Sequence, residues 1–141
     1  MSPDFHGLPT RVLDNGLIRL EYLATAGPRL VRLFLENSQE NLLAEVPDLG
    51  WDTPFGRYRL YGGHRLWHAP EALPRSCIPD NDGLEIEELP DGVRLWRPAE
   101  PATGIWKCLE VRLDPGQMAL TLHHELCNDG LWPVELAPGS W

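Results

Sequence analysis

The chain has 141 residues, of which 43% are hydrophobic and 23% charged, a composition typical of one soluble globular domain over residues 1–141. Its formal net charge of −9 argues against nucleic acid and anionic membranes as partners, because both repel an acidic surface. No apolar run approaches the roughly 18 residues that span a bilayer, and the first residues lack the pattern of a signal peptide, so we expect a cytoplasmic protein.

Runs of alternating apolar and polar residues, separated by turn residues, predict an all-β protein. The 13 glycines and 14 prolines disfavour long helices, and no segment shows helical periodicity. We predict strands near residues 10–14, 17–23, 29–35, 84–89, 93–97, 105–113, 118–127 and 132–137. Each predicted hairpin buries one face, as two stacked antiparallel sheets require, so the sequence predicts an antiparallel β-sandwich.

Three turns set the expected pairing of the strands. A two-residue turn at Asn15-Gly16 separates an apolar side from a polar side that carries Arg19 and Glu21. Turns at Asp91-Gly92 and Pro115-Gly116 each gather a further apolar side. The three apolar sides contain Leu13, Ile18, Leu20 and Tyr22, then Leu84, Ile86, Val93 and Leu95, then Ile105, Leu109, Val111, Leu113, Met118, Leu120, Leu122 and Leu126.

The hairpin at Pro115-Gly116 also carries the most unusual pair of residues in the sequence. A two-residue turn puts Lys107 opposite His124 on the otherwise apolar face, and Cys108 opposite His123 on the polar face. A lysine and an imidazole beside a core must find partners or reach solvent. The pair therefore belongs either to a ligand site or to a sheet rim where the lysine extends into water.

The segment 47–83 is expected to differ from the rest of the chain. Several prolines interrupt it, and five aromatic residues make it cohesive, namely Trp51, Phe55, Tyr58, Tyr61 and Trp67. We predict long ordered loops with short strands, and one helical turn at residues 70–73. Loops of this length inside a compact domain are often functional.

The densest group of chemically active side chains lies at residues 61–71 and includes His64, Arg65, Trp67 and Glu71. Aromatic rings stack on the C–H patches of a sugar ring, arginine and histidine donate to its hydroxyls, and a carboxylate accepts from them. The combination therefore suits a carbohydrate. The alternative interpretation is a glycine turn followed by an edge strand, with Trp67 packed in the core.

A metal site is the rival interpretation of the histidines. Its ligands would come from His64, His68, His123, His124, Glu125 and Cys108. We expect residues 64 and 68 to share a face only in a helix, which Gly63 and Pro70 disfavour, and adjacent histidines in a strand point to opposite faces. We therefore expect no metal, and the absence of a dinucleotide or phosphate-binding motif predicts no organic cofactor.

Five motifs occur in a recognisable order along the chain. They are Asn15-Gly16-Leu17-Ile18-Arg19-Leu20, Ala26-Gly27-Pro28-Arg29-Leu30, Asn41-Leu42-Leu43, Gly62-Gly63-His64-Arg65-Leu66-Trp67 and Leu120-Thr121-Leu122-His123-His124-Glu125-Leu126-Cys127-Asn128-Asp129-Gly130. In this order they resemble the galactose mutarotase-like superfamily, which includes the aldose 1-epimerases. The resemblance covers nearly all of the chain, as the amino-terminal half of that family's β-supersandwich.

The resemblance implies a sugar site with acid and base groups. Arg65 is similar to the family's sugar-binding arginine, and active members open the sugar ring with a histidine acid and a glutamate base. The family histidines have no counterpart near residues 76–82 or 137–141, so His64 or His68 takes that place in space. His64 and His124 are the candidate catalytic residues, and the family glutamate would fall in the carboxy-terminal half, after residue 141.

Two functions follow from these observations. The first is a carbohydrate-binding protein, up to an isomerase that interconverts sugar anomers, with Arg65, Trp67, Glu71 and Lys107 as substrate-binding residues. The second is a non-catalytic β-sandwich module for structure or interaction. We also expect a homodimer, because half a supersandwich leaves apolar faces and strand edges that a second subunit can cover.

Overall fold

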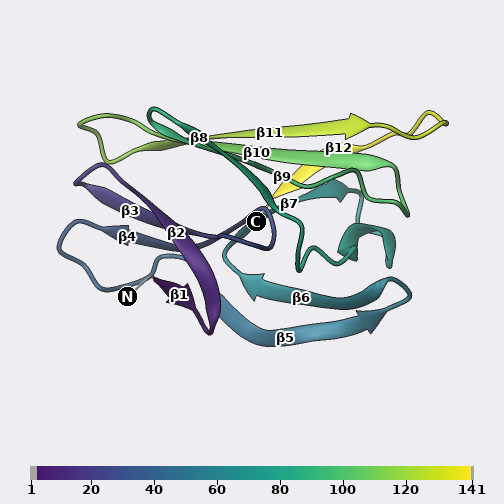
Figure 1. The fold of residues 1–141 in the computed structure, drawn as a ribbon, viewed down its shortest axis with the longest axis horizontal. Coiled ribbons are helices and arrows are strands. Elements are labelled where there is room, and N and C mark those ends of the chain that lie inside the picture. Colours follow the sequence, from purple (N-terminus) through teal and green to yellow (C-terminus); the bar gives the residue numbers. More distant parts are fainter. Residues whose placement is uncertain (1–2, 141) are drawn as a thin grey trace.

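A computed structural model describes residues 3–140 and confirms the all-β, antiparallel architecture. The strands form a six-stranded sheet of order β1-β2-β3-β4-β7-β12, a four-stranded sheet of order β11-β10-β9-β8 and a two-stranded sheet, β5-β6 (Figure 1). The elements are β1 Asp4–Phe5, β2 Leu8–Asp14, β3 Ile18–Leu23, β4 Arg29–Leu35, β5 Glu45–Thr53, β6 Gly56–Gly62, β7 His64–Ala69, the 3₁₀ turn η1 Arg75–Cys77, β8 Glu85–Leu89, β9 Gly92–Trp96, β10 Ile105–Leu113, β11 Leu120–Asn128 and β12 Ala137–Ser140.

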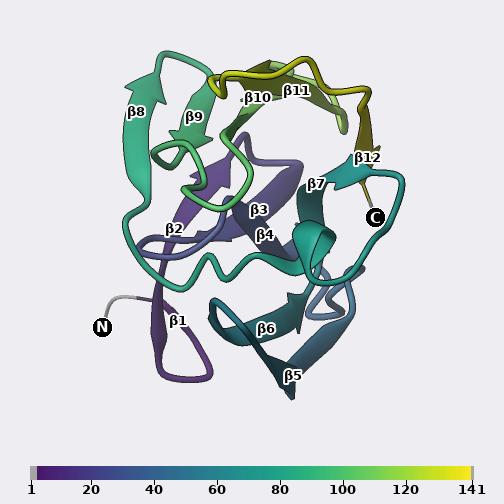
Figure 2. The same ribbon diagram turned by 90° about the vertical axis from the view of Figure 1, so that its right-hand side faces the viewer.

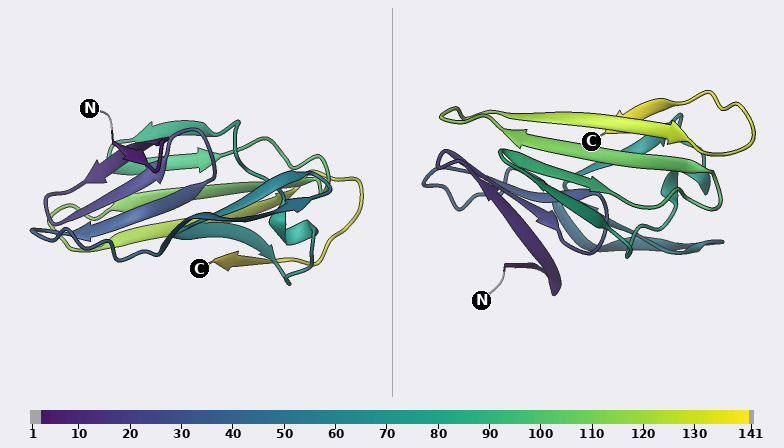
Figure 3. Two further views of the ribbon diagram at one scale, coloured as in Figure 1. Left: turned by 90° about the horizontal axis from the view of Figure 1, so that it is seen from below. Right: turned by 45° about the horizontal axis from the view of Figure 1, so that its top comes forward.

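The two larger sheets face each other as the layers of a sandwich, which Figure 2 shows along the strands. Their shared core takes residues from β3 and β4 on one side and from β9 and β10 on the other: Leu20, Tyr22, Leu30, Val93, Leu95, Leu109 and Val111. The predicted β-sandwich is therefore confirmed. The β5–β6 ribbon lies on the far side of the six-stranded sheet (Figure 3), where Tyr61 joins a second buried cluster with Phe5 and Val31.

The predicted faces of the hairpins are right, whereas two predicted registers are wrong by two residues. Leu13 pairs with Leu20 and Leu113 pairs with Leu120, so both turns are longer than the two residues expected. An even shift leaves every inward residue facing inward, because side chains alternate with a period of two. The new partners on β11 are Leu126 for Lys107, instead of His124, and Glu125 for Cys108, instead of His123.

The side chain of Asn15 joins two of these turns. Its Oδ1 accepts hydrogen bonds from the amides of Leu17 and Ile18, at 2.9 Å each, which shapes the turn between β2 and β3. Its Nδ2 donates to the carbonyl oxygens of Asp114 and Gln117, at 2.9 and 2.7 Å, in the turn between β10 and β11. One asparagine therefore links the six-stranded and the four-stranded sheet at one end of the sandwich.

The prediction of long ordered loops with short strands over residues 47–83 gives too much loop in its first half, where the strands β5, β6 and β7 take up most of the chain. The prolines made these strands hard to recognise in the sequence but do not prevent them from forming. Pro47 lies where the β5–β6 register shifts between Val46 and Gly50, an irregularity that tolerates a residue without an N–H. Pro54 lies in the turn between the two strands. The predicted helical turn at residues 70–73 is also wrong, because the only helical turn of the described segment is η1 at 75–77.

The predicted strand at residues 132–137 is wrong as well. The Asn128 side chain accepts from the amide of Gly130 at 2.9 Å and donates to the carbonyl of Trp132 at 2.8 Å, which holds this segment as a turn. Pro133 follows, and its nitrogen has no hydrogen to donate to a sheet. The chain rejoins the six-stranded sheet only as β12, which pairs with β7.

Candidate functional site

Strand β7 divides the predicted site residues between two faces. His64 and His68 face the four-stranded sheet, whereas the Arg65 guanidinium lies over the rings of Tyr58 and Trp67, at 5.4 and 5.5 Å, on the opposite face. The expectation that residues 64 and 68 share a face only in a helix is wrong, since residues four apart in a strand also share one. The six predicted residues therefore do not line one pocket.

The two candidate catalytic histidines do come together. The Nε2 atoms of His64 and His124 are 2.9 Å apart, across the space between β7 and β11, and His64 is only 8% exposed. At this distance one ring nitrogen donates and the other accepts. Burial, and the nearby imidazoles of His64 and His123, lower the pKa of His124, which favours the neutral form that such a pair requires.

Lys107 finds a buried carboxylate instead of His124. Its Nζ lies 3.0 Å from Oε2 of Glu100, which is 5% exposed. Oε1 of the same carboxylate accepts from the Thr103 hydroxyl at 2.7 Å and from Nε2 of His68 at 3.0 Å. Burial alone would raise the pKa of Glu100, but these three partners outweigh it and lower the pKa to about 2. Glu100 is therefore ionised within the protein.

Arg75 fixes the tautomer of His68. Its Nη1 lies 2.7 Å from Nδ1 of His68, and a guanidinium can only donate, so Nδ1 accepts. The ring proton is then on Nε2, where it is donated to Glu100. This arrangement gives a buried, neutral imidazole in one orientation. We call Glu100 with its partners His68, Thr103, Lys107 and the His68-bound Arg75 the Glu100 cluster.

A cleft of about 270 Å³ opens beside the Glu100 cluster. Its lining residues are Phe55, His68, Pro74, Arg75, Ala102, Thr103, Ile105, Val134 and Leu136, and we call it the histidine cleft. The volume falls near the lower limit of the roughly 300–1,000 Å³ usual for small-molecule sites, which suits one ring-sized ligand. The lining combines one aromatic ring and aliphatic groups with a guanidinium, an imidazole and a hydroxyl.

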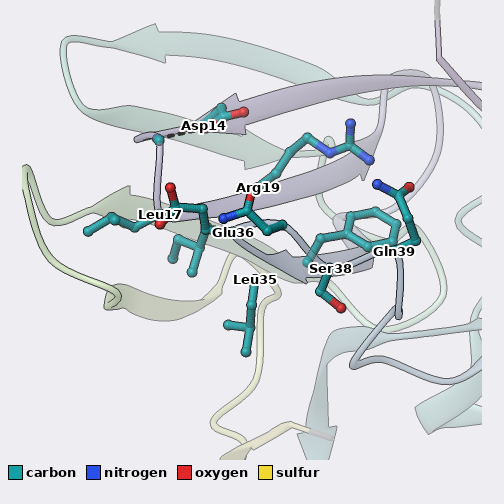
Figure 4. A pocket seen from close by; sticks show the side chains of 11 residues that line it. Asp14, Leu17, Arg19, Leu35, Glu36, Ser38 and Gln39 are labelled. Atoms are coloured by element: carbon teal, nitrogen blue, oxygen red, sulfur yellow. Dashed lines mark hydrogen bonds between the residues drawn. The ribbon is translucent and has the colours of Figure 1, made fainter.

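Of the other cavities, one of about 520 Å³ shares Phe55 with the histidine cleft and is lined by both acidic and basic side chains, among them Glu100 and Arg97. Another of about 240 Å³ lies between the turns of β2–β4, where the Arg19 guanidinium stacks 4.6 Å from the centre of the Phe34 ring. Figure 4 shows Asp14 there, bonded to its own turn, and Glu36, both of which are exposed. A third cavity is lined by Arg29 and Arg65, and Arg29 is held by both oxygens of buried Asp80 at 2.9 and 3.0 Å.

Trp67 and Glu71 lie outside the histidine cleft. The indole of Trp67 packs under β12, so closely that a Cβ on Gly139 would lie 2.5 Å from its Cε2 atom. This contact favours the alternative of Trp67 as a packing residue. Glu71 is exposed on the segment between β7 and η1. Arg65 is buried and donates to the carbonyl of Ser76 at 3.2 Å.

Sequence reasoning missed Glu100, Thr103 and Arg75. The signal that could have found the first was Lys107 itself, because a lysine on a buried face requires an anionic partner. Nothing in the sequence says which of the 21 acidic residues it is.

Within residues 3–140, no group of three or more histidine, cysteine or acidic side chains is placed to hold a metal ion. No helix in that range is both long and apolar enough to cross a membrane. The comparisons with known proteins complete the description of the site: no protein-family model, curated protein or solved structure matches the chain.

Proposed function

We propose that the chain binds a single sugar ring in the histidine cleft. The observation that carries the proposal is the orientation of His68, a buried imidazole fixed on one side by ionised Glu100 and on the other by Arg75 at the cleft wall. Both ring nitrogens of His68 are engaged in these two hydrogen bonds, so its role is to hold the Arg75 guanidinium at the wall, where Arg75 can donate to a ligand hydroxyl.

The rest of the lining fits the same ligand class. Phe55 is 51% exposed and offers a ring face to the C–H patches of a sugar. Arg75 and Thr103 supply polar groups, and the aliphatic wall of Ile105, Val134 and others excludes water from the remaining surface.

The resemblance to the galactose mutarotase-like superfamily supports this proposal. Members of that family bind sugars on a β-supersandwich, and a two-sheet antiparallel sandwich is compatible with half of one. On this basis the proposal extends to interconversion of sugar anomers, with the His64–His124 pair, outside the lining residues of the cleft, as the candidate for the proton transfers, and with His68 positioning Arg75. Neither Arg65 nor Lys107 would touch a sugar in the cleft, because Arg65 lies on the opposite face of β7 and Lys107 pairs with Glu100.

Calorimetric titration with D-glucose and D-galactose tests the binding. Phe55→Ala should weaken it about three- to tenfold, because one aromatic contact is worth about 0.5–1.5 kcal/mol. Phe34→Ala is the matched control, since that ring lines the cavity of Figure 4 instead. The proposal fails if neither sugar binds, or if Phe34→Ala weakens binding and Phe55→Ala does not.

Polarimetry on the same samples tests the isomerase activity. Fresh α-D-glucose should reach its equilibrium rotation faster with the protein than without it, and His64→Gln should remove the excess rate. Binding without any excess rate would limit the function to sugar binding.

A non-catalytic interaction module is the second candidate, favoured by the exposed segment between β11 and β12. Leu131 is 91% exposed and Trp132 77%, which is unusual for large apolar side chains. The expected homodimer would bury them. Light scattering should then give a dimer mass that Trp132→Ser converts to a monomer mass, whereas a monomer at all concentrations would contradict it.

A further inference from the structure

The lining of the histidine cleft carries positive charge only. Of the described residues that line it, Arg75 carries the only permanent charge, and none is a carboxylate. This is unexpected in a chain with 21 acidic and 12 basic residues. A small cleft whose wall presents one cation and no anion favours a ligand with a negative charge.

The carboxylate of Glu100, behind the cleft wall, does not cancel this preference. Glu100 reaches the cleft only through His68 and Thr103, and it is not itself among the lining residues. Its charge faces the ammonium of Lys107 at 3.0 Å. Glu100 and Lys107 therefore compensate each other behind the wall, and the charge of Arg75 remains.

The guanidinium of Arg75 has donors to spare. It carries five N–H groups, and its described hydrogen bonds go to Nδ1 of His68, the carbonyl of His68 and the carbonyl of Pro70. At least two N–H groups remain for a ligand. Two parallel N–H bonds are what a guanidinium offers to a planar carboxylate.

We propose that the ligand of the histidine cleft is an acidic sugar, a single ring bearing a carboxylate that Arg75 binds. This inference rests on the proposed sugar-binding function and names its substrate class. A carboxylate carries one negative charge and matches one guanidinium. A phosphate carries between one and two charges and needs further cations, but the nearby Lys107 is already paired with Glu100.

Titration with D-glucuronate and D-glucose, which differ at C6, tests the inference. Glucuronate should bind at least about tenfold more tightly at low salt, and added salt should reduce the difference. Arg75→Gln should abolish the preference, whereas Arg75→Lys, which keeps the charge, should retain part of it. Arg97→Gln is the control, because Arg97 pairs with Asp82 beside the neighbouring cavity and should leave the preference unchanged.

The outcomes separate the two proposals. Equal affinity for the two sugars would overturn the acidic-sugar inference and leave sugar binding in place. Tighter binding of glucose 6-phosphate than of glucuronate, or an equal effect of Arg97→Gln and Arg75→Gln, would overturn it as well. If none of the sugars binds, both proposals fail.

Discussion

His64 and His68 lie on one face of one strand, yet their surroundings differ in charge. His64 meets the imidazole of His124, a partner that is itself neutral. Four residues further along β7, His68 meets the ionised carboxylate of Glu100 and the guanidinium of Arg75. The comparison shows that two histidines on one strand face can have different roles, because their neighbours differ. The His64 pair can only share protons, whereas His68 is oriented by fixed charges and lines a cleft.

Replacing Glu100 by alanine is the strongest way to break this contrast. Lys107, whose side chain is only 16% exposed, would lose its anion, so the free energy of unfolding should fall by about 3–5 kcal/mol in urea denaturation. Glu88→Ala is the control, because that pair with Arg11 is exposed and should change stability by less than about 1 kcal/mol. Comparable losses in both variants would show that the Glu100 cluster does not act as a unit.

Acid denaturation should separate the two histidine environments by pH. The folded pKa of Glu100, about 2, lies below its unfolded value, so its stabilisation of about 3 kcal/mol is present above pH 5 and is lost as the pH falls toward 2. The pKa of His124 is also lowered on folding, and the unfolded chain therefore takes up a proton first. The stability that depends on neutral His124 is therefore fully present above about pH 6.5, the pKa of histidine in the unfolded chain, and declines below it.

The free energy of unfolding measured at pH steps from 8 to 2.5 checks this order. Glu100→Gln should make the decline below pH 5 smaller and leave the earlier decline near pH 6. The part that remains below pH 5 comes from Glu45 and Asp80, whose pKa values arginine partners also lower. A Glu100→Gln variant that follows the wild-type profile at every pH would contradict the assignment.

His124→Gln should have the smallest effect and should sharpen the comparison from the other side. It disrupts one hydrogen bond, so the loss in unfolding free energy at pH 8 should be about 1 kcal/mol. The decline near pH 6 should disappear. His123→Gln is the neighbouring control, because that side chain is exposed on the other face of β11, and it should keep most of the decline.

The architecture could be predicted because alternation alone identifies an inward face. Strands 29–35 and 105–113 were predicted with the bounds that the structure has, and Ile86 and Leu95, predicted on one apolar side, are paired neighbours on β8 and β9. The predicted register was wrong in the two hairpins whose turns are longer than two residues. A shift by two residues keeps every side chain on the same face, so the alternation of apolar and polar residues does not reveal it. The strands β5 and β6 were missed because their prolines read as interruptions of a sheet, whereas Pro47 lies at a register shift and Pro54 in the turn of the hairpin.

The candidate site was predictable only in part for the same reason. His64 and His124 are 60 residues apart, and their contact depends on how the two sheets stack. Lys107 was recognisable as a residue that needs a partner. Its partner Glu100 precedes β10 in a proline-rich loop, where no periodicity indicates which side chains turn inward. The position of Trp67 under Gly139 required knowledge of β12, which the sequence placed elsewhere.

The four hydrogen bonds of Asn15 act as a clamp on the sandwich. They fasten the layers at the turns of β2–β3 and β10–β11, whereas η1 and the segment before β12 lie at the other end (Figure 1). Away from these turns the layers are joined by ionisable side chains, His64 with His124 and His68 with Glu100, so acid should loosen those contacts while the uncharged asparagine bonds persist.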